Sequence, residues 1–175
     1  MIKWELIRNF KKEEFSEDPD KFADPALIYE VQSIRTEHAK PIYLSPIQGA
    51  LARFDGSDTS RHFAVNRKSD AIDIFPEGIP FEFYIRLITF QKIGGIGIYI
   101  DTTGLDEKPW VMFHIDLRPR TNYCPFLWIA KKIWVVKKHD LVTKYFYPQS
   151  DPKHWSILNN EKFFYNKQYG TGISY

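Results

Sequence analysis

The sequence lacks the features that define several whole classes of protein. Cys124 is its single cysteine, which excludes an internal disulfide and any zinc cluster built from cysteines. No apolar run approaches the roughly 18 residues needed to span a bilayer, which excludes an integral membrane protein. Residues 1–15 contain neither a continuous apolar segment nor a small-residue cleavage site, so we expect no signal peptide and no membrane insertion. The formal net charge of +2 is too small to indicate a nucleic-acid partner.

The sequence has an ordinary globular composition with an uneven distribution of charge. Of 175 residues, 43% are hydrophobic and 26% are charged, which predicts one domain or one domain with an extension. Residues 119–175 carry nine Lys or Arg and three Asp or Glu, whereas residues 1–118 carry fifteen and nineteen. The basic C-terminal part is also rich in aromatic residues. Such a segment can hold an anionic polymer or stack on sugars, and the alternative interpretation is that its rings form core or a subunit interface.

Helix and strand patterns indicate an α+β fold. Asp24 followed by Pro25 is typical of a helix start, and apolar residues at helical spacing predict a helix over 25–38. A second helix is expected from Pro80 to about residue 92, just before a pair of glycines. The order of helices and strands predicts a small, mostly antiparallel sheet with flanking helices. The expected strands lie at 41–45, 71–75, 96–100, 110–117 and 131–137.

Three short segments contain the residue types of a metal site. They are Ser60-Arg61-His62, Asp73 on the 71–75 strand, and His114 on the 110–117 strand. Zinc hydrolases commonly bind the metal through three His or carboxylate ligands and leave a fourth position for water. His62, Asp73 and His114 would supply such a set. The spacing alone is more typical of ordinary core or surface residues, because a chain with five histidines and twenty-two acidic residues produces such triplets by chance.

The motifs around these residues favour a more specific interpretation. Ser60-Arg61-His62 with Ala71-Ile72-Asp73 is similar to the S-x-H…A-x-D motif of the zinc D-alanyl-D-alanine carboxypeptidase, Hedgehog and lysostaphin-like group. Residues 94–99 and 113–118 resemble the G-G-x-G-x-Y…F-x-H-x-D-x-R signature of its phage and bacterial peptidase branch. These motifs occur in the family's order.

The resemblance covers roughly residues 8–120. An F-x-x-x-E-F run at 10–15 and a P-I-x-x-S run at 41–45 match the opening of the same family. The resemblance implies a Hedgehog/D-Ala-D-Ala peptidase-like domain over residues 1–120. Residues 121–175 would then form a basic aromatic extension, packed on the same domain.

The resemblance also implies roles for individual residues. His62, Asp73 and His114 would bind Zn²⁺, with Asp70 as a competing ligand that lies outside the A-x-D match. The loop between His62 and Asp73 is longer than in the common form of the family. Ser60, Tyr99 and Arg118 are candidate substrate-binding residues, expected to lie around the metal.

Two of these roles have alternatives. Tyr99 could donate a hydrogen bond to an oxyanion or simply pack in the core. Arg118 could bind a substrate carboxylate or pair with Asp116.

Two functional groups of the family are not in their usual places. Many relatives carry a general base shortly before the last ligand, where this chain has apolar residues. Asp116 and Glu107 are therefore the candidates for the base, and Asp116 could instead orient a ligand histidine. The arginine expected after the first strand is also missing, and Arg53 or Gln48 could replace it.

These observations lead to an expected function and a rival. The resemblance implies a zinc metallopeptidase of phage type that cleaves stem peptides of bacterial peptidoglycan, acting on the host wall from a virion or from the host cytoplasm. The rival is a phage virion structural protein that keeps the peptidase fold and contacts other virion proteins. A nucleic-acid binder built on the C-terminal part is a third interpretation, which the small net charge disfavours.

Overall fold

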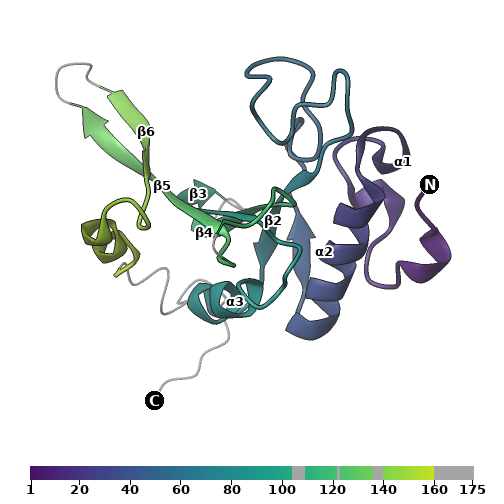
Figure 1. The fold of residues 1–175 in the computed structure, drawn as a ribbon, viewed down its shortest axis with the longest axis horizontal. Helices are drawn as coiled ribbons and strands as arrows, with labels where there is room; N and C mark the ends of the chain where they lie inside the picture. Colours follow the sequence, from purple (N-terminus) through teal and green to yellow (C-terminus); the bar gives the residue numbers. More distant parts are fainter. Residues whose placement is uncertain (104–108, 122, 136–139, 160–175) are drawn as a thin grey trace.

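The computed structural model describes residues 1–103, 109–121, 123–135 and 140–159 as an α+β protein. Its six-stranded sheet has the order β1-β2-β4-β3-β5-β6 (Figure 1). The strands are β1 (Ile42–Leu44), β2 (Ala71–Pro76), β3 (Gly95–Thr103), β4 (Pro109–Asp116), β5 (Phe126–Val135) and β6 (Asp140–Phe146). The helices are α1 (Pro19–Phe22), α2 (Pro25–His38) and α3 (Pro80–Leu87), with 3₁₀ turns η1 (Trp4–Leu6), η2 (Lys12–Glu14) and η4 (Pro152–Leu158). No helix within the described ranges is long and apolar enough to cross a bilayer.

The sheet is mixed, so the prediction of a mostly antiparallel sheet needs correction. β3 and β4 are antiparallel, and β4 ends where Asp116 lies beside Gly95, at the start of β3. The other edge of β4 is already paired with β2. The chain therefore crosses to the free edge of β3 at the same end, where Phe126 pairs with Gly95, and β5 runs parallel to β3.

One face of the sheet packs on the helices and forms the core. Side chains alternate between the two faces of a strand, so every second residue of β2, β3, β4 and β5 points to the helices. The residues on this face are mostly Ile, Leu, Val and Phe, and they join buried side chains of α2 and α3 in one apolar cluster. A T-shaped contact between Phe83 of α3 and Phe113 of β4, with ring centroids 4.9 Å apart, connects the two layers. The opposite face is left for polar and aromatic groups.

Helix α2 is confirmed over the residues predicted from the sequence. The Asp24 carboxylate accepts a hydrogen bond from the Ala26 N–H, and Pro25 occupies the first turn. Such a cap typically stabilises a helix by about 1 kcal/mol. The helix ends at His38, and the next residue, Ala39, caps it in a left-handed conformation with φ of 58°.

The C-terminal part of the described chain continues the sheet. The first half of β5 is buried beside β3, whereas the β5–β6 hairpin extends away from the helices (Figure 1). The strand predicted at 131–137 thus begins earlier, at Phe126. Cys124 is exposed in the connection that precedes β5.

Candidate metal centre

The three predicted metal ligands meet on the sheet face opposite the helices. Asp73 on β2 and His114 on β4 are direct partners in the antiparallel register, so their side chains leave the sheet side by side. His62 comes from the long loop between β1 and β2. Its carbonyl accepts a hydrogen bond of 2.7 Å from the Arg53 N–H within this loop, and the Asp73 N–H donates to the Ala50 carbonyl at 3.1 Å, which joins the loop to β2.

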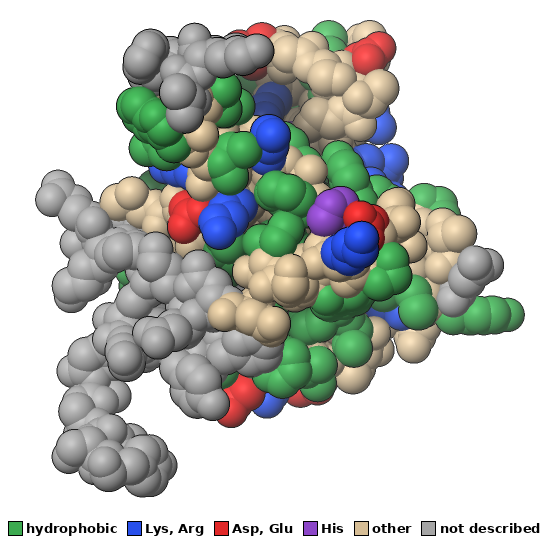
Figure 2. Space-filling view, turned by 90° about the vertical axis from the view of Figure 1, so that its left-hand side faces the viewer, with side chains coloured by type: hydrophobic (Ala, Val, Ile, Leu, Met, Phe, Trp, Pro, Cys, Tyr) green, Lys and Arg blue, Asp and Glu red, His purple; other side chains and the backbone are tan. Residues whose placement is uncertain are grey.

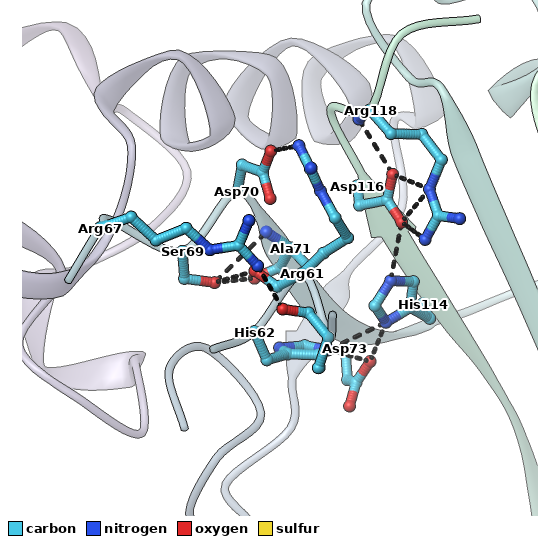
Figure 3. Close-up of polar contacts among 11 residues, drawn as sticks. Arg61, His62, Arg67, Ser69, Asp70, Ala71, Asp73, His114, Asp116 and Arg118 are labelled. Atoms are coloured by element: carbon cyan, nitrogen blue, oxygen red, sulfur yellow. Dashed lines mark hydrogen bonds and ion pairs between the residues drawn. The ribbon is translucent and has the colours of Figure 1, made fainter. Parts of the chain in front are cut away.

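The ligand atoms form a tight triangle. His62 Nε2 lies 2.9 Å from His114 Nδ1, and Asp73 Oδ1 lies 3.0 Å from His114 Nδ1 and 3.3 Å from His62 Nε2 (Figure 3). Atoms that ligate a tetrahedral zinc ion at about 2.0–2.1 Å are about 3.3 Å apart. Two imidazole nitrogens and a carboxylate oxygen are also the donors that zinc prefers. The buried group of His62, Asp73 and His114 could therefore hold a metal ion with little rearrangement.

Burial and charge favour a cation at this position. The three side chains are at most 10% exposed. Burial raises the pKa of Asp73, but hydrogen bonds with His114 and His62 outweigh this effect and hold that pKa well below its ordinary value. Burial lowers the pKa of His114, but contacts with Asp116 and Asp73 raise it overall. A carboxylate anion thus faces two imidazoles, and protons compete with a cation for the same atoms.

We refer to His62, Asp73 and His114 together as the cluster. Asp116 lies behind His114 and away from the cluster. Its Oδ2 atom is 3.2 Å from His114 Nε2, the ring nitrogen opposite the one that joins the triangle (Figure 3). An Nε2–H donated to Asp116 leaves the Nδ1 lone pair directed at the cluster. Of the two roles considered for Asp116, this geometry favours the orientation of a ligand histidine.

Arg118 completes the support of His114. Its Nε–H group donates to Asp116 Oδ1 and Oδ2 at 2.8 and 2.9 Å, and its backbone N–H donates to Oδ1 at 3.0 Å. The Asp116 side chain is fully buried. Burial raises the pKa of Asp116, but His114 and Arg118 together hold it well below its ordinary value. Two roles were predicted for Arg118, and the structure shows the second of them, the pairing with Asp116.

Glycines on β3 make room for this arrangement. Gly95 faces Asp116 and Gly97 faces His114 in the β3–β4 register. On its other side Gly97 pairs with Trp128 of β5, whose ring lies over His114 with centroids 5.0 Å apart. A Cβ atom at position 97 would lie 2.5 Å from the Trp128 ring, too close for any real contact. Close packing at this site therefore explains why the G-G-x-G motif has glycine at positions 95 and 97.

The variant Gly97→Ala tests this close approach. We expect it to lower the free energy of unfolding by about 1–3 kcal/mol, because the new methyl group must displace the Trp128 ring. Urea unfolding of the single and double variants measures the effect. In a Trp128→Ala background the same substitution should cost much less. An equal cost in both backgrounds would show that the ring is not what the methyl group meets.

The cluster lies in a cavity of about 240 Å³ whose lining includes all three candidate substrate-binding residues, Ser60, Tyr99 and Arg118. An adjoining cavity of about 390 Å³ shares Arg53, Asp73 and Tyr99 with it. Burial raises the pKa of Tyr99, and the Asp73 carboxylate raises it further, so this hydroxyl stays protonated and can donate a hydrogen bond.

Arg53 reaches both cavities because a carboxylate holds its loop. Glu17 accepts hydrogen bonds from the backbone N–H groups of Gly49, Leu51 and Ala52, at 2.5, 3.1 and 3.0 Å. Nothing in the sequence singles out Glu17, because its partners are more than thirty residues away. Gln48, the other replacement considered for the missing arginine, lines the larger cavity.

The variant Glu17→Ala should loosen this loop. Hydrogen bonds to a charged group contribute about 1.5–3 kcal/mol, so we expect a loss of about 2 kcal/mol in the free energy of unfolding. Glu13, exposed on the same N-terminal segment, provides the matched control, and Glu13→Ala should stay within about 0.5 kcal/mol of wild type. Equal losses in urea unfolding would contradict the anchoring role.

The remaining candidates are separate from the cluster. Asp70, the competing ligand, pairs with Arg61 instead. Glu107, the other candidate base, lies outside the described residues. Within the described part of the chain, Asp73 is the one carboxylate that lines the smaller cavity.

Comparisons of this chain with protein-family models, with curated proteins and with solved structures find no match. The site itself defines an α+β protein with a buried two-histidine, one-carboxylate group that could hold a metal ion.

Proposed function

We propose that this chain is a zinc-dependent peptidase that hydrolyses peptide bonds in the stem peptides of bacterial peptidoglycan, and that it is of phage origin. The observation that carries the proposal is the triangle of His62, Asp73 and His114 on the wall of an open cavity. Three protein ligands with room for a fourth are typical of catalytic rather than structural zinc sites. The substrate class comes from the motif resemblance.

Each group around the cluster has a role in this proposal. Zinc in such a site supplies a Lewis acid that polarises a carbonyl group and acidifies water. The protonated Tyr99 hydroxyl, which lines the cavity, would donate to the substrate carbonyl oxygen as negative charge develops there. Arg53 binds a carbonyl or carboxylate between the two cavities. Asp116 and Arg118 keep the His114 ring in position.

The larger cavity suits a peptide that carries charges of both signs. Its lining includes the cationic Arg53 and Lys132, the anionic Asp101 and several hydroxyl-bearing residues. Stem peptides contain free carboxylates and amines. This combination supports a peptide substrate with charged ends.

One observation favours a second candidate function, that of a virion structural protein without turnover. Within the described ranges, no carboxylate other than the ligand Asp73 lines the metal cavity, and Asp116 faces away from it. Trp134 and Leu141, 58% and 57% exposed on the β5–β6 hairpin, would then contact neighbouring subunits.

Digestion of purified peptidoglycan by the zinc-loaded chain tests the proposed function. We expect new amino groups and shortened stem peptides, detected by mass spectrometry, and their loss on addition of a chelator. The variant His154→Ala, which changes a histidine outside the cluster, should retain activity. Zinc binding without product release, together with stable assembly of the chain, would support the structural alternative instead.

A further inference from the structure

An aromatic groove lies next to the metal cavity, and its aromatic residues belong to the part of the chain that the motif resemblance does not cover. Its volume is about 470 Å³, and its aromatic lining consists of Phe126, Trp128, Tyr145 and Tyr147. We refer to this feature as the aromatic groove. Figure 2 views the molecule from the side of the β5–β6 hairpin, where hydrophobic side chains gather beside a few charged ones.

The sheet register presents these rings on one face. Phe126 and Trp128 are two residues apart on β5, so both point to the same side of the sheet as His114. Tyr145 of β6 pairs with Ala130, so it points to that side as well. The Phe126 ring lies 6.0 Å from Trp128 and 5.8 Å from Tyr147, measured between centroids. Phe126, Tyr145 and Tyr147 are 37%, 51% and 40% exposed, so the folded chain leaves these ring surfaces in water.

Polar groups at the edge of the rings indicate the chemistry of the occupant. Ser57 and Thr59, which carry hydroxyl groups, also line the groove. The Arg118 guanidinium lies over Phe126 and Trp128, 5.4 and 5.1 Å from the ring centroids. A pyranose ring has an apolar C–H face that packs on aromatic rings and a rim of hydroxyls that needs hydrogen-bond partners. The two hydroxyls bond to each other at 2.6 Å and the guanidinium pairs with Asp116, and a hydroxyl can still exchange further hydrogen bonds with the rim of a sugar.

The groove is continuous with the metal cavity. Ser60, Arg118, Trp128 and Tyr145 line both of them. We propose that the aromatic groove binds an N-acetylhexosamine of the glycan strand and thereby delivers the attached peptide to the metal centre. This inference rests on the proposed function, because it assigns a binding site to the glycan part of the same substrate.

A titration with a β-1,4-linked N-acetylglucosamine tetramer tests this inference without any need for catalysis. The tetramer is added to the zinc-free full chain, and binding is followed by backbone amide chemical shifts. We expect binding that Tyr147→Ala weakens by about tenfold or more, because it removes one stacking ring. Tyr147→Phe keeps the ring and should retain most of the affinity. Tyr123→Ala is the matched control, since Tyr123 is 91% exposed and does not line the groove.

The outcomes separate this inference from the proposed function. The variant His62→Ala should bind the tetramer like wild type, so loss of zinc or of peptidase activity leaves the sugar test intact. Absence of tetramer binding by wild type, or equal weakening by Tyr147→Ala and Tyr123→Ala, would overturn the sugar subsite. Self-association of the chain that Tyr147→Ala weakens, without tetramer binding, would identify a protein-contact surface and overturn it too.

Discussion

Alanine at either of two cluster positions, in His62→Ala or Asp73→Ala, is expected to abolish zinc binding. Each variant leaves two of the three protein ligands, and the lost atom is one corner of the triangle around the metal position. Changes in groups that only support a ligand lower metal affinity by about 10–100-fold, so loss of a ligand should exceed about 100-fold. Zinc content after dialysis, measured by mass spectrometry, should be about one ion per chain in wild type and close to zero in both variants.

Control variants separate the loss of zinc binding from a loss of folding. His154→Ala changes a histidine of η4 and should keep its zinc. Asp73→Asn preserves the size of the side chain while removing its charge, so it should fold and bind zinc much less tightly than wild type. Zinc retained by all of these variants would place the metal elsewhere, and no zinc in wild type after reconstitution would remove the peptidase proposal.

The second large effect is expected at Asp116. In Asp116→Ala, His114 and Arg118 lose the buried carboxylate between them, and breaking such a group costs about 3–5 kcal/mol. Urea unfolding should show this loss, whereas Asp58→Ala on the exposed loop should remain within about 0.5 kcal/mol of wild type. Asp116→Asn should fold better than Asp116→Ala and should lower zinc affinity by about 10–100-fold, because the ring of His114 is then poorly oriented.

The Asp116 carboxylate also makes the free energy of unfolding depend on pH in the acid range. The pKa of Asp116 in the folded protein lies well below its ordinary value of 3.8. Its stabilising contribution is therefore fully present above that ordinary value and is lost as the pH falls toward the folded pKa. Asp116→Asn should unfold with a weaker acid dependence than wild type. An acid dependence that is unchanged in this variant would contradict the coupling between Asp116 and its partners.

Several features follow from local sequence alone. The helix over 25–38 is determined by its own residues, because Asp24 caps it, Pro25 starts it and its apolar residues recur at helical spacing. The strand alternation similarly predicts that Asp73 and Phe75 share a face. The ligand set of His62, Asp73 and His114 could be proposed because short motifs contain these residues in a recognisable order. Local rules and short motifs therefore account for these elements and for the choice of ligands.

Other features depend on contacts between distant residues. We expected α3 to continue to about residue 92, but it ends at Leu87. The Arg120 side chain, far away in sequence, donates to the carbonyls of Ile88, Phe90 and Ile93 and so stabilises the turn that replaces the last part of the expected helix. The parallel pairing of β3 with β5 has the same origin, since it depends on which sheet edge was still free.

At the site, the sequence by itself determined which residues could bind a metal, and the tertiary structure decided what surrounds them. Residue types and spacing specify donor chemistry because that chemistry belongs to each side chain. Whether Asp116 faces the cavity or supports His114, and whether Glu17 anchors the loop of Arg53, depends on positions set by the packed sheet. The aromatic groove exists only because β5 crosses to β3 and brings its rings beside the cluster, a placement that no local pattern encodes.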